Sequence, residues 1–258
     1  MLSKKPTFIV RLATTPADLV AAQRLRYSVF VDELKGDGAN VDHHSKRESD
    51  EFDIHASHLL LEDTNREDGD RLVGVYRLMT SEQAQAAGGF YCANEFNLSV
   101  LINSGRQLLE LGRSCLHHEY RGGTAMLHLW AGLADFATKQ NIEILFGAAS
   151  FHGTNIDQLA EPLSYLANKH AANNTMTATA ILPNAVSMSI ISPDQIDRKA
   201  AVRATPALIK AYLRLGGVVG QGAYVDRAFN TTDVCLILDT AKMTARATAL
   251  YGVSPAYD

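Results

Sequence analysis

Short apolar runs separated by polar turns follow one another along the chain, and they alternate with segments in which apolar residues recur at helical spacing. The runs that predict strands are Phe8–Ala13, His58–Glu62, Leu72–Leu78, Gln107–Leu116, Ile142–Ala149, Ala223–Val225 and Val234–Leu238. The segments that predict helices are Thr15–Leu34, Thr124–Thr138, Asp157–His170, Ala207–Leu215 and Lys242–Tyr251. This order predicts a mixed α/β (α+β) fold, in which helices cover the faces of a sheet.

Two stretches lack a clear periodicity of apolar residues. Residues 35–54 are polar and rich in charge, so we expect a loop, and long loops in compact domains often carry function. Residues 171–205 contain only short β-like pieces, such as Thr177–Leu182.

The composition of the chain predicts one folded unit. Hydrophobic residues make up 47% and charged residues 20% of its 258 residues, which is enough apolar material for a full core. No repeat, low-complexity tract or linker rich in Pro, Gly or Ser divides it. We therefore expect a single domain over residues 1–258, with a core over about residues 8–170 and a C-terminal part, residues 171–258, that completes the sheet.

Charge and cysteine content narrow the class of protein. The net charge of −4 argues against general nucleic-acid binding, which requires a basic surface. The three cysteines form no CxxC pair, so we expect reduced thiols and no cysteine zinc site. Neither a signal peptide nor a run of the roughly 18–20 apolar residues needed to span a membrane is predicted, so we expect a cytoplasmic protein.

The most informative local motif is the stretch Glu110–Gly123, where a strand leads into a helix with a glycine-rich start. Backbone N–H groups at such a start favour an anion such as a phosphate, and Arg121 adds positive charge. Glu110 and Arg113 point to opposite sides of a regular strand, unless Gly112 marks a bulge that redirects one of them. A strand with an outward-facing charged side chain, followed by an ordinary helix N-terminus, would give the same sequence pattern without a function.

This segment resembles the carrier-binding segment of the GNAT superfamily of N-acyltransferases, in which a pantetheine pyrophosphate lies on the turn. Thr124 stands where a further glycine is expected, which points away from acetyl-coenzyme A as donor. The resemblance implies a GNAT-like, mostly antiparallel central sheet. Seven residues resemble, in order and spacing, the acyl-homoserine-lactone synthase branch, whose donor is acyl carrier protein. They are Arg26, Phe30, Asp50, Asp53, Arg77, Glu110 and Arg113.

Four further segments resemble the ornithine-lipid N-acyltransferases, and this likeness extends from about residue 8 to residue 252. They are Leu145–Thr154, Leu163–Leu166, Pro206–Gly216 and Phe229–Val234. The resemblance implies that a 3-hydroxyacyl group passes from the 4′-phosphopantetheine arm of acyl carrier protein to the α-amine of L-ornithine. The product would be lyso-ornithine lipid, in the first step of ornithine lipid biosynthesis, and no cofactor would be bound permanently.

Candidate residues follow from this chemistry and from the resemblance. Glu110 and Arg113 are the predicted catalytic pair, with Glu110 as proton acceptor; alternatively, Glu110 only pairs with Arg113 or Arg77 and stabilises the sheet. An arginine suits the carboxylate of ornithine and carboxylates suit its ammonium, and the predicted acceptor-binding residues are Arg26, Asp50, Asp53 and Arg77. Glu51 and Glu95 are further candidate carboxylates for the ammonium, although a solvated position in a polar loop is the favoured interpretation of Glu51. The predicted donor-binding residues are Phe30, Arg121, Gly122, Gly123 and Ser150.

An acidic carrier also requires a basic face on the enzyme. Cationic residues gather in one C-terminal stretch, and together with Arg121 they are candidates for it: Arg198, Lys199, Arg203, Lys210 and Arg214. A helix face with scattered lysines and arginines would look the same.

Several alternatives stay open at this stage. A different amine would make the protein an N-acyl amino acid or acyl-homoserine-lactone type synthase, and loss of turnover would leave a non-catalytic module that binds acyl carrier protein. Adjacent histidine pairs and the lack of HExxH spacing predict no metal site. Ser150 lacks the GxSxG context, so we expect direct transfer, with Cys115 as a core thiol. The amphiphilic product leaves peripheral contact with the inner membrane open.

Overall fold

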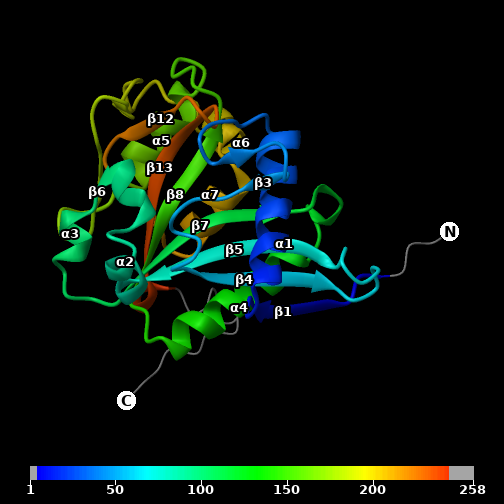
Figure 1. Ribbon diagram of the computed structural model, residues 1–258. Coiled ribbons are helices and arrows are strands. Elements are labelled where there is room, and N and C mark those ends of the chain that lie inside the picture. Colours follow the sequence, from blue (N-terminus) through cyan, green and yellow to red (C-terminus); the bar gives the residue numbers. More distant parts are fainter. Residues whose placement is uncertain (1–4, 244–258) are drawn as a thin grey trace. The chain divides into compact units, whose positions relative to one another are not determined.

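The computed structural model describes residues 5–243, which form two compact units. The first comprises residues 5–87 and 111–141, and the second comprises residues 88–110 and 142–243. The prediction of a single domain stays a prediction. The predicted fold class is confirmed: strands pair mostly antiparallel in each unit, and helices pack against them (Figure 1).

Four strands run through the first unit in the order β1 (Phe8–Leu12), β4 (Ser57–Asp63), β5 (Leu72–Thr80) and β7 (Leu108–Leu116). The two strands predicted at His58–Glu62 and Leu72–Leu78 are confirmed, and they form a hairpin: β4 and β5 pair antiparallel from Ser57 opposite Leu78 to Glu62 opposite Leu72. Only residues 111–116 of β7 belong to this unit, and the start of the strand belongs to the second.

Helices α1 (Pro16–Arg26) and α4 (Ala125–Lys139) cover opposite faces of the first unit's strands (Figure 1). Leu60 packs in a core cluster with residues of α1, whereas its neighbour Leu59 lies against α4. Successive residues of a strand point to opposite faces, so the two helices lie on opposite sides. Gly132 allows α4 to approach closely, because a Cβ there would lie 2.5 Å from Val10 Cγ1.

The first helix departs from the predicted course. A capping box at Thr15 and Asp18 begins it as predicted, but the α-helix ends at Arg26 and a π-helix, Tyr27–Glu33, continues it. The stretch 35–54 is not only a loop, because β2 (Val41–Asp42) and β3 (Arg47–Glu48) pair within it. Helix α2 (Ser81–Ala86) and the 3₁₀ turn His118–Tyr120 complete this unit.

The second unit is built around β8 (Ile144–His152) and β13 (Thr231–Asp239), which pair antiparallel along their whole length. Residues Leu108–Glu110 of β7 pair with β8 in parallel. Beyond β13 lie β12 (Ala223–Asp226), β10 (Ala185–Val186) and β11 (Val218–Val219). Most residues of β13 are buried, as expected for a central strand covered on both faces.

Shorter elements complete the second unit. They are the 3₁₀ helix η2 (Tyr91–Asn94), β6 (Phe96–Asn97), α3 (Ser99–Ile102), α5 (Ala160–Lys169), β9 (Thr179–Ala180), α6 (Arg198–Ala204), α7 (Ala207–Arg214) and the 3₁₀ turn Thr240–Lys242. The predicted helix Lys242–Tyr251 lies outside the described residues from position 244 onward. Among the described residues, no helix combines the length and apolar character that crossing a membrane requires.

Candidate functional site

Six charged side chains of the first unit form a closed ring of ion pairs, in which arginines and carboxylates alternate. In ring order they are Arg26, Glu48, Arg113, Asp50, Arg77 and Asp53. Glu48 joins two of the arginines: it accepts from Arg26 Nε at 2.5 Å and from Arg113 Nε at 3.0 Å.

The two aspartates close the ring. Asp50 accepts from Arg113 Nη2 at 3.0 Å and from Arg77 Nη1 at 2.5 Å. Asp53 accepts from Arg77 Nη1 at 2.8 Å and from Arg26 Nη1 at 2.7 Å. The side chains are between 0% and 11% exposed. Because three positive and three negative groups balance, the ring carries no net charge, which limits the cost of burying it.

Different elements supply the ring. Arg26 ends α1, Glu48 lies on β3 and Arg77 lies on β5. Arg113 lies on β7 with φ of 50°, a left-handed conformation that a residue other than glycine rarely adopts without a constraint. The irregularity expected near Gly112 therefore falls on Arg113, and two ion pairs hold that side chain in place.

The ring keeps Asp53 ionised. Burial by itself would raise the pKa of Asp53, but the positive charges of Arg26 and Arg77 outweigh burial and hold that pKa below its ordinary value. Burial likewise opposes the charge of Arg26, and Glu48 and Asp53 raise its pKa above the ordinary value. Arg26 and Asp53 thus stabilise each other's charge.

Glu110 has different surroundings, in the second unit. Its carboxylate accepts hydrogen bonds from the backbone N–H groups of Tyr91, at 2.9 Å, and Cys92, at 2.6 Å. Its side chain is buried, with 4% of the residue exposed. Because each carboxylate oxygen accepts one backbone N–H, the two bonds fix the orientation of the carboxylate.

The thiols are poor nucleophiles. Hydrogen bonding with Cys235 and burial raise the pKa of Cys92 well above its ordinary value, and the charges of Glu110 and Glu95 add to this. The Cys92 Sγ accepts the backbone N–H of Ala148 at 3.1 Å. Burial raises the pKa of Cys115, which lies in the core as expected, to about 12. Both thiols therefore stay protonated at neutral pH.

Three carboxylates of the second unit also lie together. Oxygens of Glu95, Asp226 and Asp233 are within 4.8 Å of one another, and such a group attracts cations, whether a metal ion or an ammonium. Ser150, a predicted donor-binding residue, lies opposite Asp233 on the neighbouring strand and is exposed.

The glycine-rich turn lies in the first unit, between β7 and α4. Gly122 has φ of 76°, which favours glycine. No side chain caps the start of α4, so its first N–H groups are not satisfied by a side-chain oxygen. Arg121 is not a free cation: its Nη2 lies 2.8 Å from Glu33, and it also donates to the Leu116 carbonyl. Phe30 packs at the edge of the core cluster beside α1.

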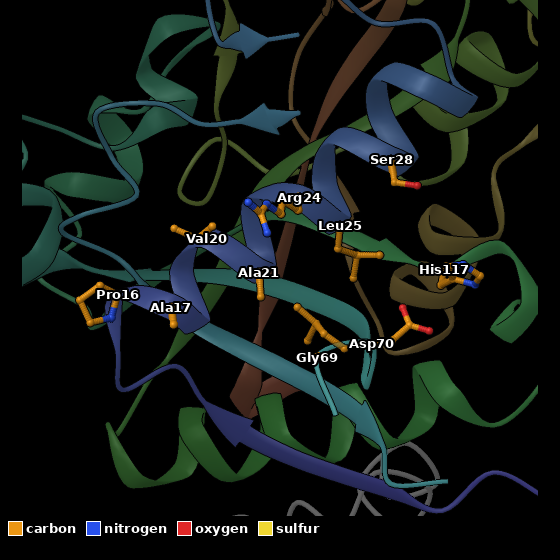
Figure 2. A pocket seen from close by; sticks show the side chains of 11 residues that line it. Pro16, Ala17, Val20, Ala21, Arg24, Leu25, Ser28, Gly69, Asp70 and His117 are labelled. Carbon is orange, nitrogen blue, oxygen red and sulfur yellow. The ribbon is translucent and has the colours of Figure 1, made fainter. Parts of the chain in front are cut away.

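A groove of about 650 Å³ runs along α1 (Figure 2). Val20 and Ala21 of the helix and Leu72 give it apolar walls, while Arg24 and His117 add polar groups. Burial lowers the pKa of His117. None of the predicted site residues lines this groove. Arg24 and the ring member Arg26 are two positions apart on the helix, about 200° around its axis, so they face different sides.

The sequence comparisons define the family. Residues 25–131 match the model of the acetyltransferase (GNAT) domain. A Rhodobacter capsulatus protein named L-ornithine N(alpha)-acyltransferase is 49% identical over 247 residues, which cover 95% of each chain. This chain belongs to the L-ornithine N(alpha)-acyltransferase family. A Rhizobium meliloti member of the family is 40% identical, over 94% of this chain and 83% of its own.

Solved structures support the fold that the family implies. FeeM, an N-acyl amino acid synthase from uncultured soil microbes, superposes with a TM-score of 0.54 at 14% identity, over 95% of this chain and 99% of its own. The acyl-homoserine-lactone synthase LasI gives 0.52 at 15% identity, over 98% and 100%. At these identities the likeness shows the fold alone. The expected GNAT-like fold and family are thus confirmed.

The structure brings together five of the predicted residues and adds one that was missed. Glu48 has no motif of its own, but charge balance is a usable signal. The three ring arginines were predicted together with only two aspartates, and a buried cluster needs a third carboxylate for neutrality. The backbone donors Tyr91 and Cys92 have no comparable signal, since any residue carries an N–H.

Proposed function

We propose that this protein transfers a 3-hydroxyacyl group from acyl carrier protein to the α-amine of L-ornithine, giving lyso-ornithine lipid in the first step of ornithine lipid biosynthesis. The observation that carries the proposal is the 49% identity, over 95% of the chain, to a protein named for acylation of the α-nitrogen of ornithine. The carrier as donor and the 3-hydroxyl group are part of the proposal.

Glu110 is the proposed proton acceptor. The lone pair of the neutral amine attacks the thioester carbonyl carbon, the C–N bond forms, and the C–S bond breaks to release the thiol of the phosphopantetheine arm. Glu110 accepts the proton that the amine gives up, directly or through a water, and returns one proton by the same route to the departing sulfur, so that the carboxylate is restored. The two backbone N–H bonds from Tyr91 and Cys92 support this role, because they fix the position and orientation of the carboxylate.

The ring of ion pairs supports a second part of the proposal, the binding of the acceptor. Arg26 Nη2 is buried and has no hydrogen-bond acceptor among the described residues. We assign this donor to the carboxylate of ornithine. Asp50, Asp53 and Arg77 then act by holding Arg26 and Arg113 in place, and Arg113 orients the segment of β7 that follows Glu110.

The donor arm is assigned to the turn before α4. The uncapped N–H groups of that helix and the backbone at Gly122 and Gly123 suit a phosphate. Arg121 would add a charge-assisted bond on exchanging one contact with Glu33. Phe30 and Ser150 remain proposed donor-binding residues.

A single-turnover assay tests the acceptor. Purified protein is mixed with 3-hydroxyacyl carrier protein and offered L-ornithine, L-lysine, L-glutamine, glycine and L-tyrosine in parallel, with products identified by mass spectrometry. We expect acylated ornithine as the dominant product. Transfer mainly to another amine would overturn the acceptor assignment, and binding of the carrier without any transfer would favour a non-catalytic module.

A further inference from the structure

Helices α6 and α7 of the second unit carry a dense group of cations. They are Arg198, Lys199, Arg203, Lys210 and Arg214, and no Asp or Glu occurs between positions 198 and 214. This stands out in a chain whose net charge is −4. Among the described residues, none of the five forms an ion pair with a carboxylate, whereas Arg106 of the same unit is paired with Asp239 at 2.7 Å.

Packing turns the cations of α6 outward. The helix rests on its buried Ala201, and the residues on its opposite side are exposed. Residues four positions apart lie one above the other on a helix. Arg198 therefore lies next to Val202, and Lys199 lies next to Arg203. The carboxylate of Asp197 caps the start of the helix, where it accepts the backbone N–H groups of Lys199 and Ala200, and within the described part of the chain it forms no ion pair with the five cations.

Helix α7 extends the same surface. Its buried residues are Ile209 and Tyr212, and Lys210 and Arg214 are one helical turn apart on another side. Lys210 Nζ donates to the carbonyl oxygen of Val202 on α6 at 3.2 Å. This bond brings a cation of α7 next to the exposed side of α6, so the charges form one surface, which we call the α6–α7 face.

We propose that the α6–α7 face is the docking surface for acyl carrier protein, an acidic partner. This inference rests on the proposed function, which names the carrier as acyl donor. Complementary charge steers an acidic protein to such a face and fixes its orientation. A bilayer is a poorer match, because membrane-surface helices also present a large apolar side. Here Val202, 38% exposed, is the one large apolar residue of α6 that the surface offers.

Charge reversal tests the docking surface. The variant Arg198→Glu, Arg203→Glu, Arg214→Glu is compared with a control, Lys5→Glu, Arg24→Glu, Lys46→Glu. The control residues are also exposed and form no ion pair among the described residues, but they lie in the first unit. Binding of the carrier with its phosphopantetheine arm attached is titrated at low and at high salt.

We expect the triple variant to bind the carrier at least about tenfold more weakly than wild type at low salt, and to lose most of the salt dependence. The control should bind like wild type. In steady state the KM for the acylated carrier should rise by a similar factor, with kcat unchanged, because docking precedes chemistry. Unchanged melting curves will show that the exposed substitutions leave the fold intact.

Other outcomes separate the docking surface from the proposed function. If wild type takes acyl groups from the carrier and the variant matches it in both binding and KM, the docking surface is wrong and the function stands. If wild type neither binds the carrier nor takes acyl groups from it, both fail. If the triple variant loses binding to phosphatidylglycerol vesicles but still binds the carrier like wild type, the proposal is overturned, and the face binds a bilayer instead.

Discussion

Two charged regions of this molecule differ in how their charges are balanced. The ring in the first unit buries three arginines and three carboxylates, and each carboxylate joins two arginines. The α6–α7 face in the second unit carries cations that have no carboxylate partner among the described residues. The ring is closed to solvent, whereas the face is open to it.

The contrast separates two uses of an arginine. A buried and compensated arginine positions the backbone around it, and its removal leaves partners charged and unsolvated. An exposed and uncompensated arginine contributes little to folding and is available to a partner. Substitutions in the two regions should therefore differ in their effect on stability: those in the ring should lower the free energy of unfolding, whereas those in the face should leave it unchanged and weaken binding of the carrier.

The largest expected effect comes from breaking the ring at Arg26. Arg26→Met leaves Glu48 and Asp53 with one arginine each in a buried site, and we expect it to lower the free energy of unfolding by about 3–5 kcal/mol. Urea denaturation measures this. Arg24→Met, two positions away on the same helix but exposed, is the matched control and should change stability by less than about 0.5 kcal/mol. A loss below about 1 kcal/mol for Arg26→Met would contradict the ring's structural role.

Glu48→Gln should have the next largest effect. The substitution preserves shape but leaves the ring with an excess positive charge, so we expect a loss of about 2 kcal/mol in unfolding free energy. We also expect kcat to fall about tenfold through displacement of Arg113, with the KM for the carrier unchanged. Glu51→Gln, an exposed neighbour, is the control. If Glu48→Gln has the same stability and kcat as wild type, Glu48 is dispensable.

Acid should weaken the ring through Asp53. Its pKa is lower in the folded state than in the unfolded chain, where an aspartate titrates at about 3.9. The stabilisation is therefore fully present above about pH 5 and is lost as pH falls through the folded-state pKa. Urea titrations between pH 7 and 3 should show the difference between wild type and Asp53→Asn shrinking toward the acid end. A difference that does not change with pH would be inconsistent with this account.

The smallest expected effect on stability is at the face. Arg203→Ala removes an exposed cation without a carboxylate partner among residues 5–243, so we expect a change within about 0.5 kcal/mol in unfolding free energy. A loss above about 1 kcal/mol would mean that the face has a structural role, and the comparison with the ring would fail.

Much of the fold was predictable from the periodicity of apolar residues alone. The hairpin of β4 and β5, helix α4 and the long strands β8 and β13 have strong apolar patterns and were found close to their true bounds. Helix α6 was missed because its buried contact is a single small residue, Ala201, which gives no apolar stripe. The π-helix after Arg26 was missed because its residues keep a helical pattern.

The sequence predicted most of the residues of the candidate site, but not which of them contact one another. Arg26, Asp50, Asp53, Arg77 and Arg113 were all predicted, but the ion pairs that they form with one another were not. Which arginine pairs with which carboxylate depends on the tertiary packing of α1, β3, β5 and β7. Spacing along a sequence does not contain that information.

The most direct test of the account concerns Glu110, whose carboxylate is held by two backbone N–H groups. Single-turnover transfer from 3-hydroxyacyl carrier protein to L-ornithine is measured for wild type and Glu110→Gln across pH, alongside a carrier-binding titration. Loss of the proton acceptor should slow transfer by about 100-fold or more, while carrier binding stays at the wild-type value. A rate within twofold of wild type would contradict the assignment of Glu110 as the proton acceptor.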